Sequence, residues 1–185
     1  MTVEYSYRLV ESDYAQLQSY AELLNASFPQ ARPFTVEYLD WLYNKNPAGQ
    51  AVGYDAWFGE QLAAHYVTVP VYLMLEGEVS KGLLSLNTAT HEAHRGKGLF
   101  TELAKRTYAA AQEQGLSAVV GVANGNSAPG FIKKLAFSPI CTLDAYIGMG
   151  NPAFSAAEAL HQASSFRRHW TADELRWRIV TRAIL

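Results

Sequence analysis

The sequence predicts a mixed α/β domain in which an antiparallel meander of strands leads into a strand–helix–strand unit. Between Ala51 and Thr90, short runs rich in Val, Leu and Tyr are separated by turn residues, as in a meander. Apolar residues then recur at helical spacing from Leu99 to Gln114. A near-continuous apolar run at Ser117–Ala123 is typical of a buried strand. This order favours one mixed sheet with helices packed on it.

Composition limits the class of protein. The chain has 185 residues, 49% hydrophobic and 17% charged, which indicates one globular domain with a sizeable core. A net charge of -2 argues against a nucleic-acid partner held by bulk charge. Cys141 is the only cysteine, so we expect a reducing, cytoplasmic setting. Met1–Arg8 is unlike a signal peptide, and no apolar run approaches the ~20 residues of a membrane span, so no membrane partner is expected.

One strand and two helices are predicted before the meander. Val3–Val10 alternates and is rich in Tyr and Val, which favours a strand. Ser12 is the predicted N-cap of an amphipathic helix over Asp13–Ser27. Thr35 is expected to cap a second, shorter helix over Val36–Tyr43.

The meander is predicted as two hairpins. Ala51–Phe58 and Leu62–Val69 flank a Gly-Glu turn. Pro70 predicts a bulge or an edge position, because proline cannot donate a ladder hydrogen bond. Val71–Leu75 and Val79–Thr90 flank a second turn that contains a glycine. The last strand therefore runs directly into a loop before the helix over 99–114.

After the strand at 117–123 the pattern is weaker. A loop is followed by a short predicted helix, Phe131–Leu135, and a predicted strand, Ile140–Gly148. In the tail, two capping boxes predict helices over Ala156–Arg167 and Ala172–Val180, although the second segment could equally be a strand. We expect residues 1–150 to form the main domain.

Residues 151–185 are expected to form a C-terminal helical extension that packs on the same domain or on a partner. Trp170, Leu175, Trp177 and Ile179 must be buried somewhere. Exposure of the two tryptophans would favour a homodimer.

The loop between the central strand and the long helix has the chemistry of an anion cradle. It reads Arg95-Gly-Lys-Gly-Leu-Phe100. Glycine lets the backbone turn sharply and approach a ligand, and the first amides of a helix lack partners within it. Such a site accepts a phosphate or a pyrophosphate, and Arg95 and Lys97 add positive charge. The glycine spacing matches neither the P-loop nor the dinucleotide fingerprint.

This loop resembles the pyrophosphate-binding loop of the GNAT (acyl-CoA N-acetyltransferase) superfamily, whose pattern is Gln/Arg-x-x-Gly-x-Gly/Ala. Phe100 departs from the usual small residue. The segment Asn124–Phe137 is similar to a later segment of the same superfamily, with Ala128 at its alanine and Ala136-Phe137 in place of its Gly-Phe pair. The superfamily's tyrosine, often the acid that protonates the leaving thiolate, falls on Ile132.

The resemblance implies a GNAT-like fold and a soluble N-acetyltransferase. The expected reaction moves an acetyl group from acetyl-CoA, the co-substrate, to the primary amine of an unidentified small acceptor by direct attack on the thioester. Backbone groups of a splayed central strand would pair with pantetheine like an added strand, and an N–H near Asn87 or Thr88 would polarise the thioester carbonyl. The residues expected to bind acetyl-CoA are Thr88, Ala89, Thr90, Arg95, Gly96, Lys97, Gly98, Leu99, Phe100, Asn124 and Asn126.

Three residues are candidates for catalysis. Ser85 and Asn87 lie on the central strand, where the superfamily places its base, and Tyr146 could take over the role of the acid. An alkyl amine has a pKa of about 10, so a group must remove its proton before attack. Because neither Ser nor Asn is a strong base, a water relay or His65 is the alternative.

Other titratable side chains are given structural roles. His91 and His94 flank the loop without a His-Glu-x-x-His motif, so no metal is expected, and both are interpreted as solvated loop residues or as neighbours of the phosphates. Cys141 is interpreted as an inert core residue of an apolar strand.

Two other functions remain open. The absence of an obvious base and the presence of Ile132 favour a non-catalytic acyl-CoA-binding or sensing module as the alternative. A nucleic-acid-binding domain that uses the basic loop is the weaker third hypothesis. Aromatic residues of the first section could line the acceptor side or simply pack in the core; they are Phe34, Tyr38, Trp41 and Trp57.

Overall fold

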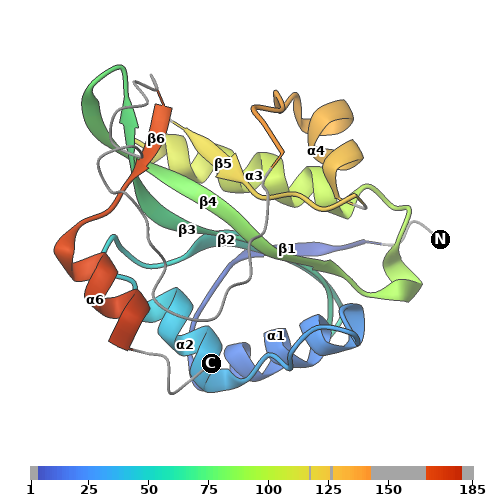
Figure 1. The fold of residues 1–185 in the computed structure, drawn as a ribbon. Coiled ribbons are helices and arrows are strands. Elements are labelled where there is room, and N and C mark those ends of the chain that lie inside the picture. Colours follow the sequence, from blue (N-terminus) through green and yellow to red (C-terminus); the bar gives the residue numbers. More distant parts are fainter. Residues whose placement is uncertain (1–3, 117, 126, 143–165, 181–185) are drawn as a thin grey trace.

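The computed structural model describes residues 4–116, 118–125, 127–142 and 166–180 as a mixed six-stranded sheet between helices. The strand order is β1-β2-β3-β4-β5, with β6 paired with β3. Helices α1 and α2 cover one face of the sheet, and α3 and α4 lie on the other (Figure 1). This confirms the predicted α/β class with a mixed sheet. In the described ranges, no helix is both long and apolar enough to cross a membrane.

The first helices begin at side-chain caps, as the sequence predicts, although one cap is shifted. Strand β1 (Ser6–Leu9) precedes α1 (Tyr14–Ser27), whose N-cap is Asp13 and not Ser12. The Asp13 carboxylate accepts a hydrogen bond from the Gln16 N–H at 3.0 Å, so the helix starts one residue later than predicted. Thr35 caps α2 (Val36–Asn44) as predicted.

The two predicted hairpins are present, but proline does not interrupt them. Strands β2 (Val52–Phe58), β3 (Gln61–Leu75) and β4 (Glu78–Thr90) are antiparallel neighbours. Pro70 lies inside β3, between the stretch of β3 that pairs with β2 and the stretch that pairs with β6. Its carbonyl accepts a hydrogen bond from the Asn46 side chain at 2.8 Å. Proline therefore fits here because no strand needs its missing N–H.

The sheet opens beside β4. Strand β5 (Val119–Gly121) runs parallel to β4 and pairs only with Leu83–Ser85. It is shorter and more exposed than the buried strand predicted over 117–123. Beyond Ser85, within the described ranges, the edge of β4 on this side has no strand partner.

Helix α3 (Leu99–Glu113) agrees with its prediction, and α4 (Ala128–Leu135) begins three residues earlier than predicted. Ile140–Thr142 is not a strand, and the rest of the strand predicted over 140–148 lies outside the described residues. Cys141 is exposed, which corrects its interpretation as a core residue.

The described part of the tail adds one strand and one helix. Strand β6 (Phe166–His169) pairs with the end of β3, so the helix predicted over 156–167 is wrong at its last two positions, and 156–165 lie outside the described residues. Helix α6 (Ala172–Val180) has the predicted capping box, in which Thr171 and Glu174 exchange hydrogen bonds at 3.1–3.2 Å.

Of the four apolar tail side chains that were expected to be buried, one is packed against the domain. Trp177 stacks on Trp41 of α2, with ring centroids 4.4 Å apart, which places α6 beside α2 (Figure 1). Trp170, Leu175 and Ile179 are exposed, contrary to the expectation that all four would be buried. The division into units 1–150 and 151–185 and the homodimer stay predictions.

The two threonine caps offer a test of whether the tail folds with the domain. Thr35→Ala and Thr171→Ala each remove a hydroxyl that accepts from an amide three residues on. We expect each substitution to lower the free energy of unfolding by about 1 kcal/mol in urea titrations followed by circular dichroism. If only Thr35→Ala lowers it, α6 does not belong to the cooperative unit.

Candidate active site

The loop before α3 presents a run of backbone amides to solvent. Gly96 and Gly98 have φ of 76° and 79°, a left-handed conformation that favours glycine. Gly98 is the N-cap of α3 and offers no side chain to the first amides of the helix. Among the described residues, the N–H groups of 96–100 have no hydrogen-bond partner. The positive end of the helix dipole points at the same place, so the loop suits an anion.

The charged side chains of the loop are exposed. The Arg95 Nε–H donates to the Thr90 carbonyl at 3.3 Å, which ties the loop to the end of β4. Lys97 lies with its Nζ 6.0 Å from the Tyr5 ring. Phe100, the departure from the motif, directs its ring into the core, where it meets Phe131 at 5.3 Å and Tyr66 at 5.8 Å. The large side chain is therefore accommodated by packing, while the loop amides stay exposed.

Strand β4 contains a bulge next to this loop. Leu86 pairs with Val67 and Ala89 with His65, so two β4 residues, Asn87 and Thr88, lie opposite one residue of β3. Asn87 has a φ of 46°, which asparagine tolerates better than most residues.

The bulge determines which backbone groups face the open edge of β4. The His91 N–H donates to the Ala63 carbonyl at 2.9 Å, so the backbone of Thr90, one residue earlier, faces away from β3. By the same alternation Thr88 shares this direction. Ala89 faces β3 and packs in the core beneath α1 and α2.

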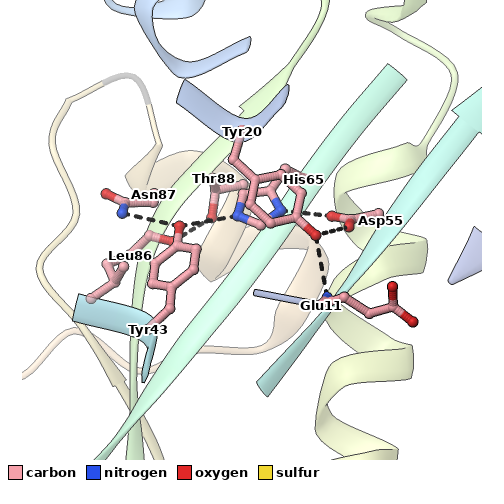
Figure 2. Close-up of polar contacts among 8 residues, drawn as sticks. All are labelled: Glu11, Tyr20, Tyr43, Asp55, His65, Leu86, Asn87 and Thr88. Atoms are coloured by element: carbon pink, nitrogen blue, oxygen red, sulfur yellow. Dashed lines mark hydrogen bonds and ion pairs between the residues drawn. The ribbon is translucent and has the colours of Figure 1, made fainter. Parts of the chain in front are cut away.

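The Asn87 side chain ends a buried chain of polar groups (Figure 2). Its Nδ2 donates to the Tyr43 hydroxyl at 3.2 Å, which lies 3.1 Å from His65 Nε2. His65 Nδ1 lies 2.6 Å from Asp55, whose other oxygen accepts from Tyr20 at 2.6 Å. Tyr20, Tyr43, Asp55 and His65 are all at most 1% exposed. Each buried polar group therefore has a partner.

One arrangement of protons gives every donor in this chain an acceptor. His65 Nδ1–H donates to Asp55, and the free Nε2 accepts the Tyr43 hydroxyl, which itself accepts from Asn87. Burial raises the pKa of Tyr43 and of Tyr20, so both remain neutral phenols. The chain is thus well suited to hold Asn87 in place. The sequence feature that could have predicted this buried chain is the hairpin between β2 and β3, because its register sets Asp55 opposite His65.

Ser85 and Asn87 do not face one another. The Ser85 hydroxyl is buried and lies 2.9 Å from the Tyr66 hydroxyl, in the cluster beneath α3. Asn87 instead reaches Tyr43 on α2. Asn87 is itself part of the bulge, which breaks the alternation that would have placed both side chains on one face.

A pocket of about 350 Å³ lies where β4 and β5 separate. Ser85, Leu86 and Asn87 line it from the strand, and Val122 lines it just after β5. Tyr38 of α2 contributes, whereas Trp41 and Trp57 are core residues. Another part of its wall comes from β6 and α6 and includes Arg168, Trp177 and Arg178, which the sequence pattern does not mark as site residues. A larger pocket of about 720 Å³ lies between α3, β5 and α4 and includes neither the loop nor the bulge.

Comparison with known proteins identifies the family. The sequence profile of the Acetyltransferase (GNAT) domain matches residues 6–140, well over half of the chain. The chain belongs to the GNAT acetyltransferase family. A search of curated proteins finds no match.

Solved structures share the GNAT fold. A GCN5-related N-acetyltransferase from Ralstonia eutropha is 18% identical, with a TM-score of 0.61, over 78% of this chain and 99% of that one. A predicted acetyltransferase with acetyl-CoA from Clostridium acetobutylicum is 18% identical, with a TM-score of 0.58, over 80% and 96%. N-myristoyltransferase from Saccharomyces cerevisiae with bound myristoyl-CoA is 18% identical, with a TM-score of 0.56, over 66% of this chain. The chain spans only 31% of that yeast protein. The family and these neighbours support acyl transfer from coenzyme A in general.

The second GNAT-like segment is partly described. Asn124 and Ser127 are joined by hydrogen bonds of 3.0–3.4 Å just before α4. Ile132, at the GNAT tyrosine position, is 44% exposed. Asn126 and Tyr146 lie outside the described residues, so their assigned roles stay predictions.

The two histidines beside the GNAT loop have different environments. His91 is partly exposed, but His94 is buried and lies 2.9 Å from the Tyr5 hydroxyl and 3.2 Å from Gln61 Oε1, so it is not a solvated residue. Among the described residues, no group of three His, Cys, Asp or Glu side chains is placed to hold a metal ion.

The burial of His94 makes stability depend on pH. Burial lowers the pKa of its imidazole, and Lys97 and His91 lower it further. The unfolded chain then binds the proton more readily, so the His94 contribution is present above the unfolded value of about 6.5 and is lost as pH falls below it. We expect the free energy of unfolding to decrease from about pH 7.5 to about pH 5, and to decrease less in His94→Gln. Equal decreases in both proteins, measured in urea, would contradict this role.

Proposed function

We propose that the protein is an N-acetyltransferase that moves the acetyl group of acetyl-CoA to the primary amine of a small acceptor. One observation carries the proposal: a loop of unpartnered amides, an unpaired strand edge and a pocket follow one another along β4. These are the places that a pyrophosphate, a pantetheine arm and an amine would need. The single cysteine fits a cytoplasmic enzyme.

The residues present fit the co-substrate. The amides of 96–100, with Arg95 and Lys97, would hold the pyrophosphate. The backbone of Thr88 and Thr90 would pair with the amides of pantetheine as an added strand. This arrangement would place the thioester at the bulge, beside the pocket that would hold the acceptor.

In the reaction, the amine nitrogen bonds to the thioester carbon and the carbon–sulfur bond breaks. The amine loses a proton and the leaving thiolate gains one. A backbone N–H at Asn87 or Thr88 would stabilise the negative charge on the carbonyl oxygen. The Ser85 hydroxyl is engaged with Tyr66, and, in the part of the chain that the structure describes, His65 connects to the pocket through Tyr43 and Asn87. A water relay through the pocket is therefore the proposed route for the proton of the amine.

The alternative is an acyl-CoA-binding module without turnover. It is favoured by Ile132, which stands at the position of the acid and cannot donate a proton. Release of free thiol from acetyl-CoA in the presence of any amine would exclude it.

The loop can be tested with two matched glycine variants. Gly98 and Gly115 have φ of 79° and 75°, and an added Cβ would meet nothing within 4 Å at either position. Gly98→Ala and Gly115→Ala therefore carry the same backbone strain, about 1–2 kcal/mol. We expect calorimetry to show micromolar binding of acetyl-CoA that weakens about tenfold in Gly98→Ala and is unchanged in Gly115→Ala.

The Arg95→Ala, Lys97→Ala double variant should lose the binding, because both charges are removed from the loop. If the intact protein does not bind acetyl-CoA, the transferase and the binding module are both excluded.

Two variants of Asn87 distinguish the contribution of its backbone to kcat from that of its side chain. Asn87→Gly keeps the left-handed conformation, whereas Asn87→Ala adds about 1–2 kcal/mol of strain to the bulge. If backbone amides stabilise the reacting carbonyl, kcat should stay within about threefold in Asn87→Gly and fall about tenfold in Asn87→Ala. Equal losses in both variants would assign the role to the side-chain amide.

A further inference from the structure

The pocket beside the bulge has an unusual balance of charge for a site that would bind an amine. Two of its lining residues, Arg168 and Arg178, are cationic, and none of its described lining residues is acidic. Arg168 is paired with Glu174, so the charge of Arg178 is the one left uncompensated here, and it would repel a cationic amine alone. The charge therefore indicates an acceptor that carries its own negative group.

Arg168 of β6 is partly buried and only partly paired. Its Nη2 donates to Glu174 Oε1 at 3.2 Å, and its guanidinium lies 3.8 Å from the Trp170 ring centroid. Its Nε is buried and has no hydrogen-bond partner among the described residues. The other oxygen of Glu174 already accepts the N–H and the hydroxyl of Thr171, each at 3.1 Å. Part of the Arg168 donor fork is thus held in place without an acceptor.

Arg178 of α6 is exposed, and its charge is not neutralised within the described part of the chain. Its guanidinium lies 5.5 Å from the Trp41 ring centroid and 5.9 Å from that of Trp177. Arg176, on the same helix, is instead paired with Asp173 at 3.1 Å. The stacked tryptophans therefore hold one unpaired cation at the pocket, as cation–π contacts do elsewhere.

The remaining walls and the volume limit the size of the acceptor. Apolar side chains also line the pocket, beside the arginines and the bulge residue Asn87; they include Leu42, Val69, Leu84 and Leu86. A volume of about 350 Å³ is near the lower end of the range of ligand pockets, about 300–1,000 Å³. Such a pocket suits a small molecule with an apolar body and two polar ends.

We propose that the acceptor is a small primary amine that also carries an anionic group, with the anion held by Arg168 and Arg178 and the amine directed to the bulge at Asn87. The guanidinium fork matches both a carboxylate and a phosphate. Both arginines lie beyond residues 6–140, the range that matches the GNAT profile. This inference rests on the proposed acetyl transfer and adds the chemical class of its acceptor.

Pairs of amines that differ only in the anionic group test the proposal. One pair is L-phenylalanine and phenethylamine, and the other is O-phosphoethanolamine and ethanolamine. Release of thiol from acetyl-CoA gives kcat/KM for each amine. We expect at least one anionic amine to exceed its neutral partner by about tenfold or more, the factor given by one charge-assisted hydrogen bond. The pair that shows the preference distinguishes a carboxylate from a phosphate.

Matched variants locate the preference. Arg178→Met should reduce the ratio of kcat/KM between anionic and neutral amines about tenfold, through a higher KM for the anionic amine. Arg176→Met removes the same charge from the same helix outside the pocket and should leave the ratio unchanged. Because Arg168→Met alone would leave Glu174 buried without its cationic partner, the double variant Arg168→Met, Glu174→Gln is used, and it should also reduce the ratio.

The proposal is overturned if both anionic amines react no faster than their neutral partners, or if Arg178→Met and Arg176→Met have the same ratio. If neutral amines are acetylated and the arginine substitutions do not change the ratio of kcat/KM, the anionic acceptor is excluded and the acetyltransferase proposal stands. Failure of the protein to bind acetyl-CoA would exclude the acetyltransferase proposal itself.

Discussion

The bulge in β4 at Asn87 and Thr88 is the constraint on which the candidate site depends. In an uninterrupted strand, the side chain of Ala89 would lie on the same face of the sheet as that of Ser85. Because of the extra residue, Ala89 instead lies on the face of Leu84 and Leu86, beneath α1 and α2. Past the bulge, Thr90 turns its backbone to the open edge beside β5 and accepts the Arg95 side chain. The same irregularity therefore sets the strand edge, the pocket and the position of the loop relative to both.

The buried chain from Asn87 to Asp55 explains how an irregular strand is kept in one conformation. A carboxyl group and an imidazole in a core are costly unless their hydrogen bonds are satisfied, and removing one partner is more costly still. Here each group has a partner at 2.6–3.2 Å, from α1, α2, β2, β3 and β4. Any shift of the bulge would leave the Tyr43 hydroxyl without the Asn87 donor, so the chain stabilises this register against the regular one.

The parts that could be predicted from the sequence depend on local chemistry. The Thr35 cap, the Gly-Glu turn and the glycines of the loop each act within a few residues, and all are found where they were predicted. The bulge, the opposite orientations of Ser85 and Asn87 and the pocket wall depend on partners far apart in the chain, such as Trp41 and Trp177. Periodicity cannot reveal such contacts, because it reports only which face of its own element a residue occupies.

The position of Pro70 connects the tail to the rest of the fold. Strand β2 pairs with β3 as far as Thr68, and β6 pairs with β3 from Tyr72 onward. One edge of β3 is therefore covered first by a strand from the N-terminal part of the chain and then by a strand from the tail. Pairing with β3 brings Arg168 to the pocket, and the Trp41–Trp177 stack brings Arg178 to it as well. The GNAT-matched part of the chain supplies the loop and the bulge, and the residues beyond it supply the charged wall. Under the proposed function, substitutions in β6 and α6 could therefore change the acceptor and leave the loop before α3 untouched.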